Sequence, residues 1–395
     1  MHIASRSPAD ILAAYQATPV AERAAFVSAA VTPMATTLQD SDRVTALAHV
    51  DVDAFETGLR AALRVNPANI TALRSLVSLF NRLARFAEAE EVIAQGIQHW
   101  SDHAEFPLER LRMLIVQNSP RRYEAFEAGV PFYKNLIQHQ FYESQVRYDP
   151  ANGLPNAVEL DRMTKIGKAT FADMLAGEGT PAQSRIHRTE RAIFRRICEL
   201  IVEADRVALV GNGPSLIDAG HGGEIDGHDL VIRCNFPELQ GREADIGERT
   251  DLVVFNESLR NSIKAMRLRS PHYESVLALG VHPDRNRGLP PKGTPQGDIV
   301  APILDNLATL PPVGRAFLSD AFYPRATTGV MTALLLALVF QRQVSLFGFD
   351  FFDDANRPHY FGNQIGAYLG HELAYEKWFA QGFLGSIAPG RIVLR

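Results

Sequence analysis

Residues 206–216 read Arg-Val-Ala-Leu-Val-Gly-Asn-Gly-Pro-Ser-Leu. The first five form a short apolar, β-branched run, which is typical of a buried strand, and the glycines after it permit a tight turn. Similar runs recur at 229–233, 251–255, 275–279 and 343–347, separated by segments of helical pattern. Continuous apolar strands alternating with helices predict an α/β domain with a mostly parallel sheet covered on both faces. Ligands of such sheets bind beyond the carboxyl ends of the strands.

The composition is that of an ordinary globular protein long enough for two domains. The chain has 395 residues, a formal net charge of −5 and two cysteines, Cys198 and Cys234. This charge argues against nucleic acid as the main partner, because phosphate binding needs a concentrated basic surface. Two cysteines make no disulfide framework, and no cysteine–histidine group has zinc-ligand spacing. The first residues lack a signal-peptide pattern, and the longest apolar run, 329–340, is too short to span a bilayer, so we expect a cytoplasmic protein.

The first part of the chain is predicted to be helical. Between residues 51 and 100, apolar side chains recur at helical spacing, which indicates two helical hairpins. The pattern repeats weakly after 34 residues, the period of tetratricopeptide repeats. Such a unit can offer a groove to a protein partner, or its helices can simply pack on a catalytic domain, and both interpretations stay open. The residues that recur are Glu56, Leu59, Ala62 and Leu63, which correspond to Glu90, Ile93, Gly96 and Ile97.

Turn-rich pieces between residues 148 and 184 are typical of a connection between domains. We predict a helical, tetratricopeptide-like domain over 1–150, a linker over 151–180 and an α/β domain over 181–395. An amphipathic helix at 185–202 is expected to open the α/β domain and to pack on its sheet. Alternatively, its basic face is a candidate contact with the inner surface of an anionic membrane.

Gly211, Asn212 and Gly213 follow the first predicted strand, where the backbone can approach a phosphate or a sugar. A dinucleotide-binding fingerprint would need a glycine at the position of Leu216 and an acid at the end of the second strand. The second strand runs into Asn235 instead. An NAD site therefore lacks two of its parts.

The residues after this turn carry a longer pattern. Residues 223–235 read GEIDGHDLVIRCN, and 244–250 read ADIGERT. Together with the glycine turn, they resemble the large sialylmotif of glycosyltransferase family 29, the eukaryotic-type sialyltransferases. Three further motifs of that family follow in the family's order: the small motif at 326–329 and 344–349, the third at 359–363, and H-x4-E as His371 and Glu376.

The resemblance implies a Rossmann-like, GT-A-like sheet that transfers sialic acid, with inversion, from its CMP donor to a glycan. It makes His371 the base for the acceptor hydroxyl, Glu376 the residue that orients this base, and His359 a contact of the leaving phosphate. The chemistry agrees, because a leaving phosphate monoester needs neither a strong acid nor a metal, whereas the acceptor hydroxyl needs a base. We therefore expect no cofactor and no metal. The nucleotide contacts carried over are Gly211, Asn212, Gly213 and Asn235 for phosphate and ribose, and Thr327, Thr328 and Gly329 for cytosine and the donor carboxylate.

Three alternatives stay open. The eight-carbon acid Kdo is also carried by CMP and shares the donor chemistry, so a Kdo transferase of capsule or lipopolysaccharide synthesis fits nearly as well. A catalytically inactive scaffold whose helical repeats bind a partner also fits, although intact His359, His371 and Asn235 argue against it. The third is a magnesium site after the last predicted strand, at Asp350, Asp353 and Asp354.

The chain also departs from the family. The disulfide that joins the large and small motifs there has no counterpart, since the corresponding positions are near Arg206 and at Gln341. Its absence fits a bacterial-type enzyme of a reducing compartment. The proline-rich stretch 282–298 is the best candidate for a mobile lid. Asn235 and Thr328 also have purely structural interpretations, as caps of a turn and of a helix.

Overall fold

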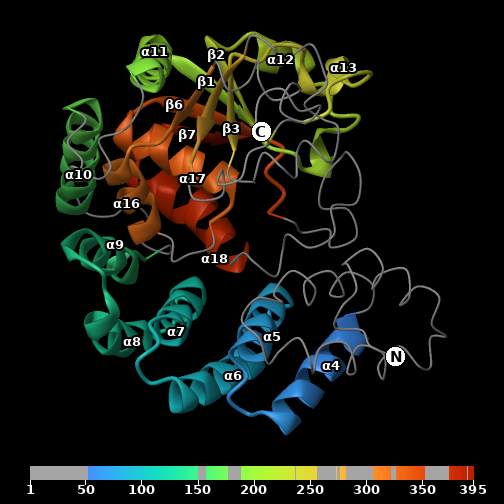
Figure 1. Cartoon of the computed structure of the whole chain (residues 1–395), viewed down its shortest axis with the longest axis vertical. Coiled ribbons are helices and arrows are strands. Elements are labelled where there is room, and N and C mark those ends of the chain that lie inside the picture. Colours follow the sequence, from blue (N-terminus) through green and yellow to red (C-terminus); the bar gives the residue numbers. More distant parts are fainter. Residues whose placement is uncertain are drawn as a thin grey trace. The chain divides into compact units, whose positions relative to one another are not determined.

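The computed structural model describes residues 52–149, 157–176, 188–235, 237–255, 276–281, 306–321, 326–351, 373–388 and 390–395, together with Tyr273 (Figure 1). The described chain forms two compact units. The helical unit comprises the residues up to His139 and the later helix α18 (Leu373–Trp378). The sheet unit comprises the residues from Gln140 to Phe351 and from Phe379 onward.

The sheet unit is built on parallel strands in the order β5-β4-β3-β2-β1-β6-β7, which confirms the predicted α/β fold. The strand order reverses at β1, where Ala208 pairs with Val231 of β2 on one side and with Ser345 of β6 on the other. Such a switch point leaves a crevice at the carboxyl ends, where ligands of open parallel sheets bind. The strands are β1 (Arg206–Val210), β2 (Leu230–Cys234), β3 (Leu252–Phe255), β4 (Leu277–Gly280), β5 (Leu307–Thr309), β6 (Gln343–Phe347) and β7 (Ile392–Leu394).

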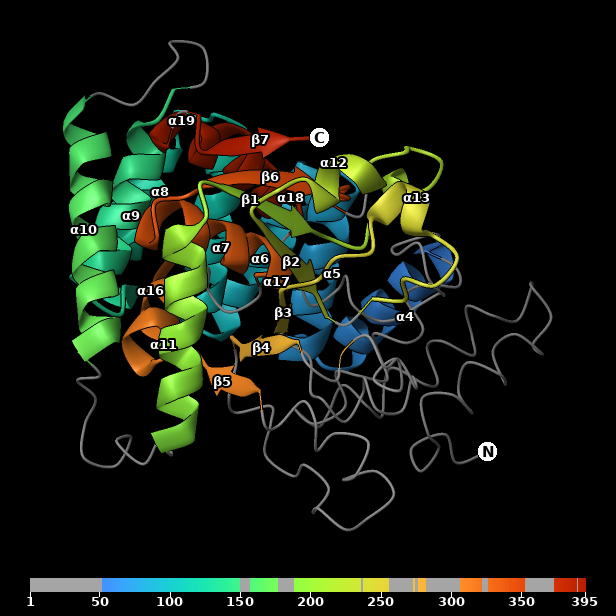
Figure 2. The same cartoon turned by 90° about the horizontal axis from the view of Figure 1, so that it is seen from above.

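Helices cover both faces of this sheet. They are α10 (Ala157–Ala176), α11 (Arg188–Glu203), the 3-10 turn η3 (Pro214–Leu216), α12 (Gly222–Asp226), α13 (Glu243–Ile246), α16 (Pro312–Ala321), α17 (Thr328–Leu334), the π-helices η7 (Leu335–Val339) and η9 (Phe379–Leu384), and α19 (Gly385–Ile387). Ile225 of α12 and Ile246 of α13 form one core with Ala208 and Phe347. The predicted amphipathic helix is α11, which packs against β4 and β5, and Figure 2 shows it across the sheet from α12 and α13.

The helical unit is a series of helices in which each packs on the next. The predicted helical pattern between residues 51 and 100 is therefore confirmed, but the described residues form three helices there and not the four of two hairpins, since the next helix begins at Glu105. The identity of these helices as tetratricopeptide repeats stays a prediction. Leu59, Ala62 and Ile93 of the repeating pattern are buried, and a Cβ at Gly96 would lie 2.4 Å from the Phe106 ring, so this position must be small. The helices are α4 (Val52–Val65), α5 (Ile70–Arg82), α6 (Phe86–His99), α7 (Glu105–Val116), α8 (Arg122–Gly129), the 3-10 turn η2 (Val130–Phe132) and the start of α9 (Leu136–Arg147).

The segment predicted as a linker, 151–180, contains the long helix α10. This helix packs against η7 and α16 within the sheet unit. A Cβ at Gly167 would lie 1.9 Å from the carbonyl oxygen of Leu338, so the two backbones are in direct contact there. The turn-rich sequence flanking α10 suggested a connection, but the buried Met163 and Met174 anchor the helix. The compact units accordingly divide near residue 139, ahead of the predicted boundary.

None of the helices in the described part of the chain combines the length and the apolar character needed to cross a bilayer.

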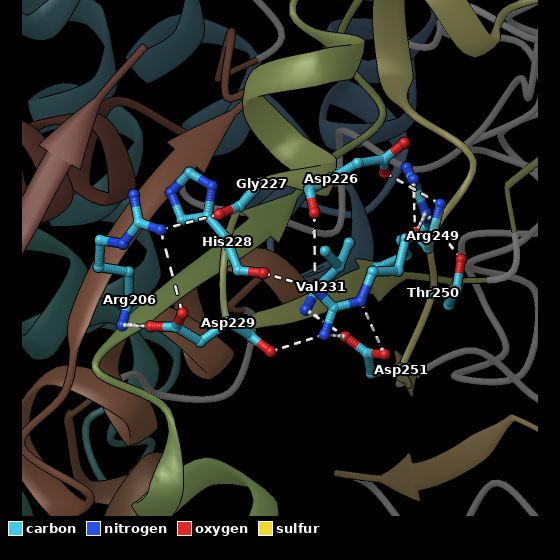
Figure 3. Close-up of polar contacts among 10 residues, drawn as sticks. Arg206, Asp226, Gly227, His228, Asp229, Val231, Arg249, Thr250 and Asp251 are labelled. Carbon is cyan, nitrogen blue, oxygen red and sulfur yellow. Dashed lines mark hydrogen bonds and ion pairs between the residues drawn. The ribbon is translucent and has the colours of Figure 1, made fainter.

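A carboxylate and a glycine shape the turn that leads into β3. Asp226 accepts hydrogen bonds from the backbone N–H groups of Glu248 and Arg249, each at 2.9 Å (Figure 3). Gly247 has a φ of 72°, and a Cβ there would lie 2.3 Å from a carboxylate oxygen of Asp226. Only glycine tolerates both conditions. The aspartate and the glycine of the resembled motif therefore have a structural role in this turn.

The Arg249 side chain ties the same turn to the start of β2. Its guanidinium donates to the carbonyl oxygens of His228 at 2.5 Å and Asp229 at 2.6 Å (Figure 3). Its Nε donates to Asp251 at 3.1 Å, and Asp251 also accepts from the backbone N–H of Val231 at 2.8 Å. Charge-assisted bonds of this kind are stronger than neutral ones, so they set how β2 and β3 begin.

We predict that Asp226→Asn lowers the stability of the sheet unit by about 1–3 kcal/mol, because the new amide nitrogen would face a backbone N–H and leave it unpaired. Calorimetric unfolding measures the effect. The control is Glu248→Gln, which removes the same charge from an exposed side chain of the same turn while keeping the Glu248 backbone bond. Equal melting temperatures for Asp226→Asn and the control would contradict the structural role.

Candidate functional site

The glycine turn after β1 packs directly on the end of β6. The backbone N–H of Gly211 donates to Phe347 at 2.8 Å, and that of Gly213 donates to Gly348 at 3.0 Å. A Cβ at Gly211 would lie 2.5 Å from the Gly348 oxygen, and one at Gly213 would lie 2.5 Å from the carboxylate of Asp350. Gly348 itself has a φ of 67°. The glycines therefore allow two strand ends to meet at the switch point of the sheet.

Asp350 is engaged in this same turn. Its carboxylate accepts from the backbone N–H of Ser215 at 2.9 Å and from the Ser215 hydroxyl. It thus closes the short turn η3. No group of three metal-ligating side chains occurs among the described residues. Asp353 and Asp354, the other two acids of the predicted magnesium site, lie outside the described residues.

Asn212 bridges the ends of β1 and β2. Its Nδ2 donates to the carbonyl oxygen of Cys234 at 2.9 Å. Only 8% of the residue is exposed, and its Oδ1 has no hydrogen-bond partner within the part of the chain that the structure describes. A buried acceptor without a partner is costly, and such atoms are found where a ligand supplies the missing donor. Asn212 therefore offers an acceptor at the switch point.

Asn235 and Thr328 meet at the same edge of the sheet. Asn235 follows β2 in the left-handed backbone region, with a φ of 60°, and its N–H donates to Val254 of β3 at 2.9 Å. Asparagine tolerates this conformation better than most residues, and residues in strained conformations cluster at functional sites. The Thr328 hydroxyl donates to Asn235 Oδ1 at 3.3 Å. Two predicted nucleotide contacts, distant in sequence, are thus in contact.

The predicted segment 327–329 begins helix α17. Thr327, and not Thr328, is the N-cap: its hydroxyl accepts from the backbone N–H of Val330 at 3.4 Å. The Thr328 side chain is thereby released to contact Asn235. A Cβ at Gly329 would lie 2.7 Å from the ring of Phe349, so the helix start packs closely on the segment after β6. All seven predicted nucleotide contacts belong to the sheet unit.

Only part of the predicted catalytic set lies within the described residues. His359 and His371 lie outside the described residues, as does the predicted lid at 282–298. Glu376 is described: it lies on α18, is 1% exposed and belongs to the helical unit. The sequence predicted that Glu376 belongs to the α/β domain, because α18 follows the last long strand of the sheet in the chain. The structure assigns it to the helical unit instead.

Both cysteines are buried thiols. Burial raises the pKa of Cys198 to about 12 and that of Cys234 to about 12. Cys234 directly precedes Asn235, yet its thiol stays protonated at neutral pH and is a poor nucleophile. The described polar side chains of this site are the amides of Asn212 and Asn235 and the hydroxyl of Thr328.

The comparisons with known proteins agree with this geometry. Residues 201–286 match the family model for glycosyltransferase family 29 (sialyltransferase). Over these residues the chain is similar to the family 29 sialyltransferases. The matched residues include the glycine turn, Asn235 and the turn before β3, which confirms the predicted resemblance to this family.

Three curated relatives of the family match over short segments. The rat alpha-2,8-sialyltransferase 8E is 46% identical over 55 residues, or 14% of this chain and 15% of the relative. A mouse CMP-N-acetylneuraminate-beta-galactosamide-alpha-2,3-sialyltransferase 1 is 46% identical over 61 residues, which are 15% of this chain and 18% of the relative. The Xenopus laevis alpha-N-acetylneuraminide alpha-2,8-sialyltransferase is 36% identical over 99 residues, or 25% and 27%. The chain thus spans at most 27% of the length of these relatives.

Two solved structures are similar at low identity. A mammalian sialyltransferase in complex with Gal-beta-1-3GalNAc-ortho-nitrophenol has a TM-score of 0.35 at 18% identity, covering 67% of this chain and 96% of that one. A mutant O-GlcNAc transferase of Thermobaculum terrenum has a TM-score of 0.32 at 12% identity, and the match covers 94% of this chain and 75% of that one.

We predict that neither thiol reacts with iodoacetamide at pH 8 in the native protein. A pKa of about 12 leaves about one thiolate in ten thousand, whereas an unfolded cysteine with a pKa of about 8.5 is about one-quarter ionised. Alkylation followed by mass spectrometry should show labelling at least about a thousandfold slower than in urea. Fast native labelling of Cys234 in a Cys198→Ser variant would contradict its burial.

Proposed function

We propose that the chain is an inverting glycosyltransferase that moves sialic acid from CMP-sialic acid to a glycan acceptor. The observation that carries the proposal is the convergence of Asn212, Asn235 and Thr328 at the carboxyl ends of β1 and β2, with Asn212 and Asn235 inside the family 29 segment. The crevice at a sheet's switch point is where nucleotides bind in related α/β folds.

The Asn212 acceptor, which has no partner within the described part of the chain, narrows the proposed nucleotide contact of this residue. Its Oδ1 can only accept a hydrogen bond, while its Nδ2 is already bonded to the Cys234 carbonyl. A phosphate oxygen is itself an acceptor and gains nothing from this atom. A ribose hydroxyl is a donor. We therefore assign Asn212 to the ribose, in place of the shared assignment to phosphate and ribose that the family pattern suggests.

The chemical step needs two further groups. The acceptor hydroxyl must lose a proton as the new bond forms, and negative charge grows on the departing CMP phosphate. We propose His371 as the base, oriented by Glu376, and His359 as the donor to the phosphate. An imidazole suits both tasks near neutral pH. Because CMP is already a phosphate monoester leaving group, no metal or cofactor takes part in this proposal.

Sialic acid is favoured over Kdo as the donor sugar. The name of one mouse relative specifies CMP-N-acetylneuraminate, and the three curated relatives described above are all sialyltransferases. Asn212 argues against an inactive scaffold, because a buried acceptor that has no partner among the described residues is costly to a protein that binds no nucleotide.

We predict that CMP binds and that NAD does not, as measured by titration calorimetry. Asn212→Ala should weaken CMP binding about tenfold, because one hydrogen bond to the ribose is worth about 1.4 kcal/mol. The matched control is Asn69→Ala, which removes an N-cap amide of α5 in the helical unit and should leave CMP affinity unchanged. Binding of NAD without any response to CMP would overturn the nucleotide assignment.

We predict that His371→Ala lowers turnover of CMP-sialic acid by about 100- to 10,000-fold, the usual contribution of a general base. CMP affinity should stay the same, because the base contacts the acceptor and not the nucleotide. His359→Ala should weaken both turnover and CMP binding. Turnover is measured as CMP release in the presence of acceptor.

The same assay in EDTA tests metal independence, and full activity is expected. His99→Ala, an exposed histidine at the end of α6, is the control variant. If His371→Ala kept normal turnover, the base would have to be sought elsewhere, first at His282. Loss of activity in EDTA, restored by magnesium, would bring Asp350, Asp353 and Asp354 forward as ligands.

A further inference from the structure

The sheet unit contains a cavity of about 240 Å³ between α12 and the strands β1, β6 and β7. Arg206 is the first residue of β1 and Gln343 the first residue of β6, so the cavity lies at the amino ends of these strands. Asn212 follows the carboxyl end of β1, and the two ends of this five-residue strand are about 13 Å apart. The cavity is therefore separate from the candidate nucleotide site. The lining residues with polar side chains are Arg206, Glu224, His228, Gln343, Ser345 and Arg395.

The sheet face that borders the cavity changes from apolar to polar along the strands. Side chains two residues apart in a strand share a face, so Ser345 lies on the same face as Phe347, and Arg206 on the same face as Ala208. At the carboxyl half, Phe347 and Ala208 form a core with Ile225 of α12. At the amino half, Ser345 and Arg206 line the cavity instead. Parallel sheets are normally apolar on both faces, so this polar strip indicates a contact with a polar ligand.

Two of the lining side chains, His228 and Ser345, are almost fully buried, at 5% and 6% exposed. His228 Nδ1 lies 2.8 Å from the carbonyl oxygen of Glu224. A carbonyl oxygen only accepts, so Nδ1 carries the proton, and the Nε2 of the neutral ring accepts from the Ser345 hydroxyl at 3.0 Å. The oxygen of this hydroxyl can still accept a hydrogen bond from a ligand.

Two guanidinium groups reach the same cavity. Arg206 Nη2 donates to the carbonyl oxygen of Gly227 at 2.8 Å, which holds this side chain against the end of α12 (Figure 3). Arg395 Nε lies 3.1 Å from a carboxylate oxygen of Glu224. Asp229 lies 3.9 Å from Arg206, and Glu224 is the carboxylate among the described lining residues. A guanidinium has five N–H donors in a planar fork that suits carboxylates and phosphates, so both arginines keep donors for an anion.

We propose that this cavity binds a small anion that carries a hydroxyl group. Its phosphate or carboxylate group contacts Arg206 and Arg395, and its hydroxyl donates to Ser345. The volume of about 240 Å³ is below that of pockets for drug-sized ligands, so the ligand is a small molecule. The inference is independent of the proposed transferase activity, because no residue of the nucleotide site takes part in it.

Gly223 of α12 allows the cavity to be tested without a steric clash. It lines the cavity, is exposed, and a Cβ there would meet no atom within 4 Å. Glycine is a poor helix former, and a carboxylate in the first turn of a helix is favourable. Gly223→Glu therefore keeps the fold while it adds a negative charge at the cavity, where it repels an anion.

The test measures the binding of glycerol 3-phosphate to the full chain by titration calorimetry. Arg206→Gln, Gly223→Glu and the control Arg195→Gln each lower the net charge by one, so a general charge effect would be equal in all three. Arg195 is an exposed residue of α11 in the same unit. We expect Arg206→Gln and Gly223→Glu to weaken binding by about 10- to 100-fold, the usual effect of losing hydrogen bonds to a charged group. Arg195→Gln should bind as the parent chain does.

Ser345→Ala separates recognition of the hydroxyl from recognition of the anion. It should weaken the binding of glycerol 3-phosphate about tenfold. Sulfate has no hydrogen-bond donor, so its weaker binding should be the same in the parent chain and in Ser345→Ala. Glycerate, tested in parallel, shows whether the site prefers a carboxylate to a phosphate. The melting temperature of each variant without ligand identifies any loss of fold, and glycerol 3-phosphate should raise that of the parent chain.

Failure of both glycerol 3-phosphate and glycerate to bind the parent chain would overturn the inference. Equal affinity of the parent chain and Gly223→Glu would overturn it as well, because the anion would then bind elsewhere on the surface as an adventitious ion only.

Discussion

The turn after β1 can pack on the end of β6 because Gly211, Gly213 and Gly348 leave no side chain between the two backbones. A single Cβ at Gly211 or Gly213 would meet a backbone or carboxylate oxygen within 2.5 Å. This close approach joins the ends of β1 and β6 at the switch point of the sheet. It also places Asn212 beside the end of β2, where its Nδ2 donates to the Cys234 carbonyl. The other predicted nucleotide contacts depend on it, because Asn235 follows β2 and α17 precedes β6, the two strands on either side of β1.

Many residues of the segment that matches the family model, 201–286, stabilise the fold around the candidate site and do not line the site itself. Asp226, Gly247 and Arg249 fold the turn before β3, and the fully buried Arg233 donates to the carbonyl oxygens of Gly247 at 3.2 Å and Arg249 at 2.8 Å. Backbone carbonyls grouped around guanidinium groups form a rigid frame, since each charged donor satisfies several acceptors in fixed directions. These contacts hold the end of β2 in place. Asn235 directly follows β2, so its position and its left-handed backbone conformation depend on them.

The two units have different chemistry in their interiors. The sheet unit buries mostly apolar strands, as parallel sheets do, although β2 also carries the buried Arg233. The helical unit buries Glu105, Glu109, Arg112 and Glu376, and it does so on the helices that α18 joins late in the chain. Removing one partner of a buried charged contact leaves the other charge uncompensated, so these side chains constrain how the helices of this unit pack on one another.

The sequence by itself determined the parallel sheet, the glycine turn, the helix α11 that packs on the sheet, the helical character of the first unit and the resemblance to the sialyltransferases, because each is visible in local periodicity or in a contiguous motif. The three-residue strands β5 and β7 are too short to show a period, and the helix α10 was hidden between turn-rich pieces. Only the tertiary structure decided that Thr327 is the helix cap, that Thr328 contacts Asn235, and that Glu376 lies buried in the helical unit. Those facts depend on which surfaces meet, and contacts between residues distant in the chain leave no local pattern to read.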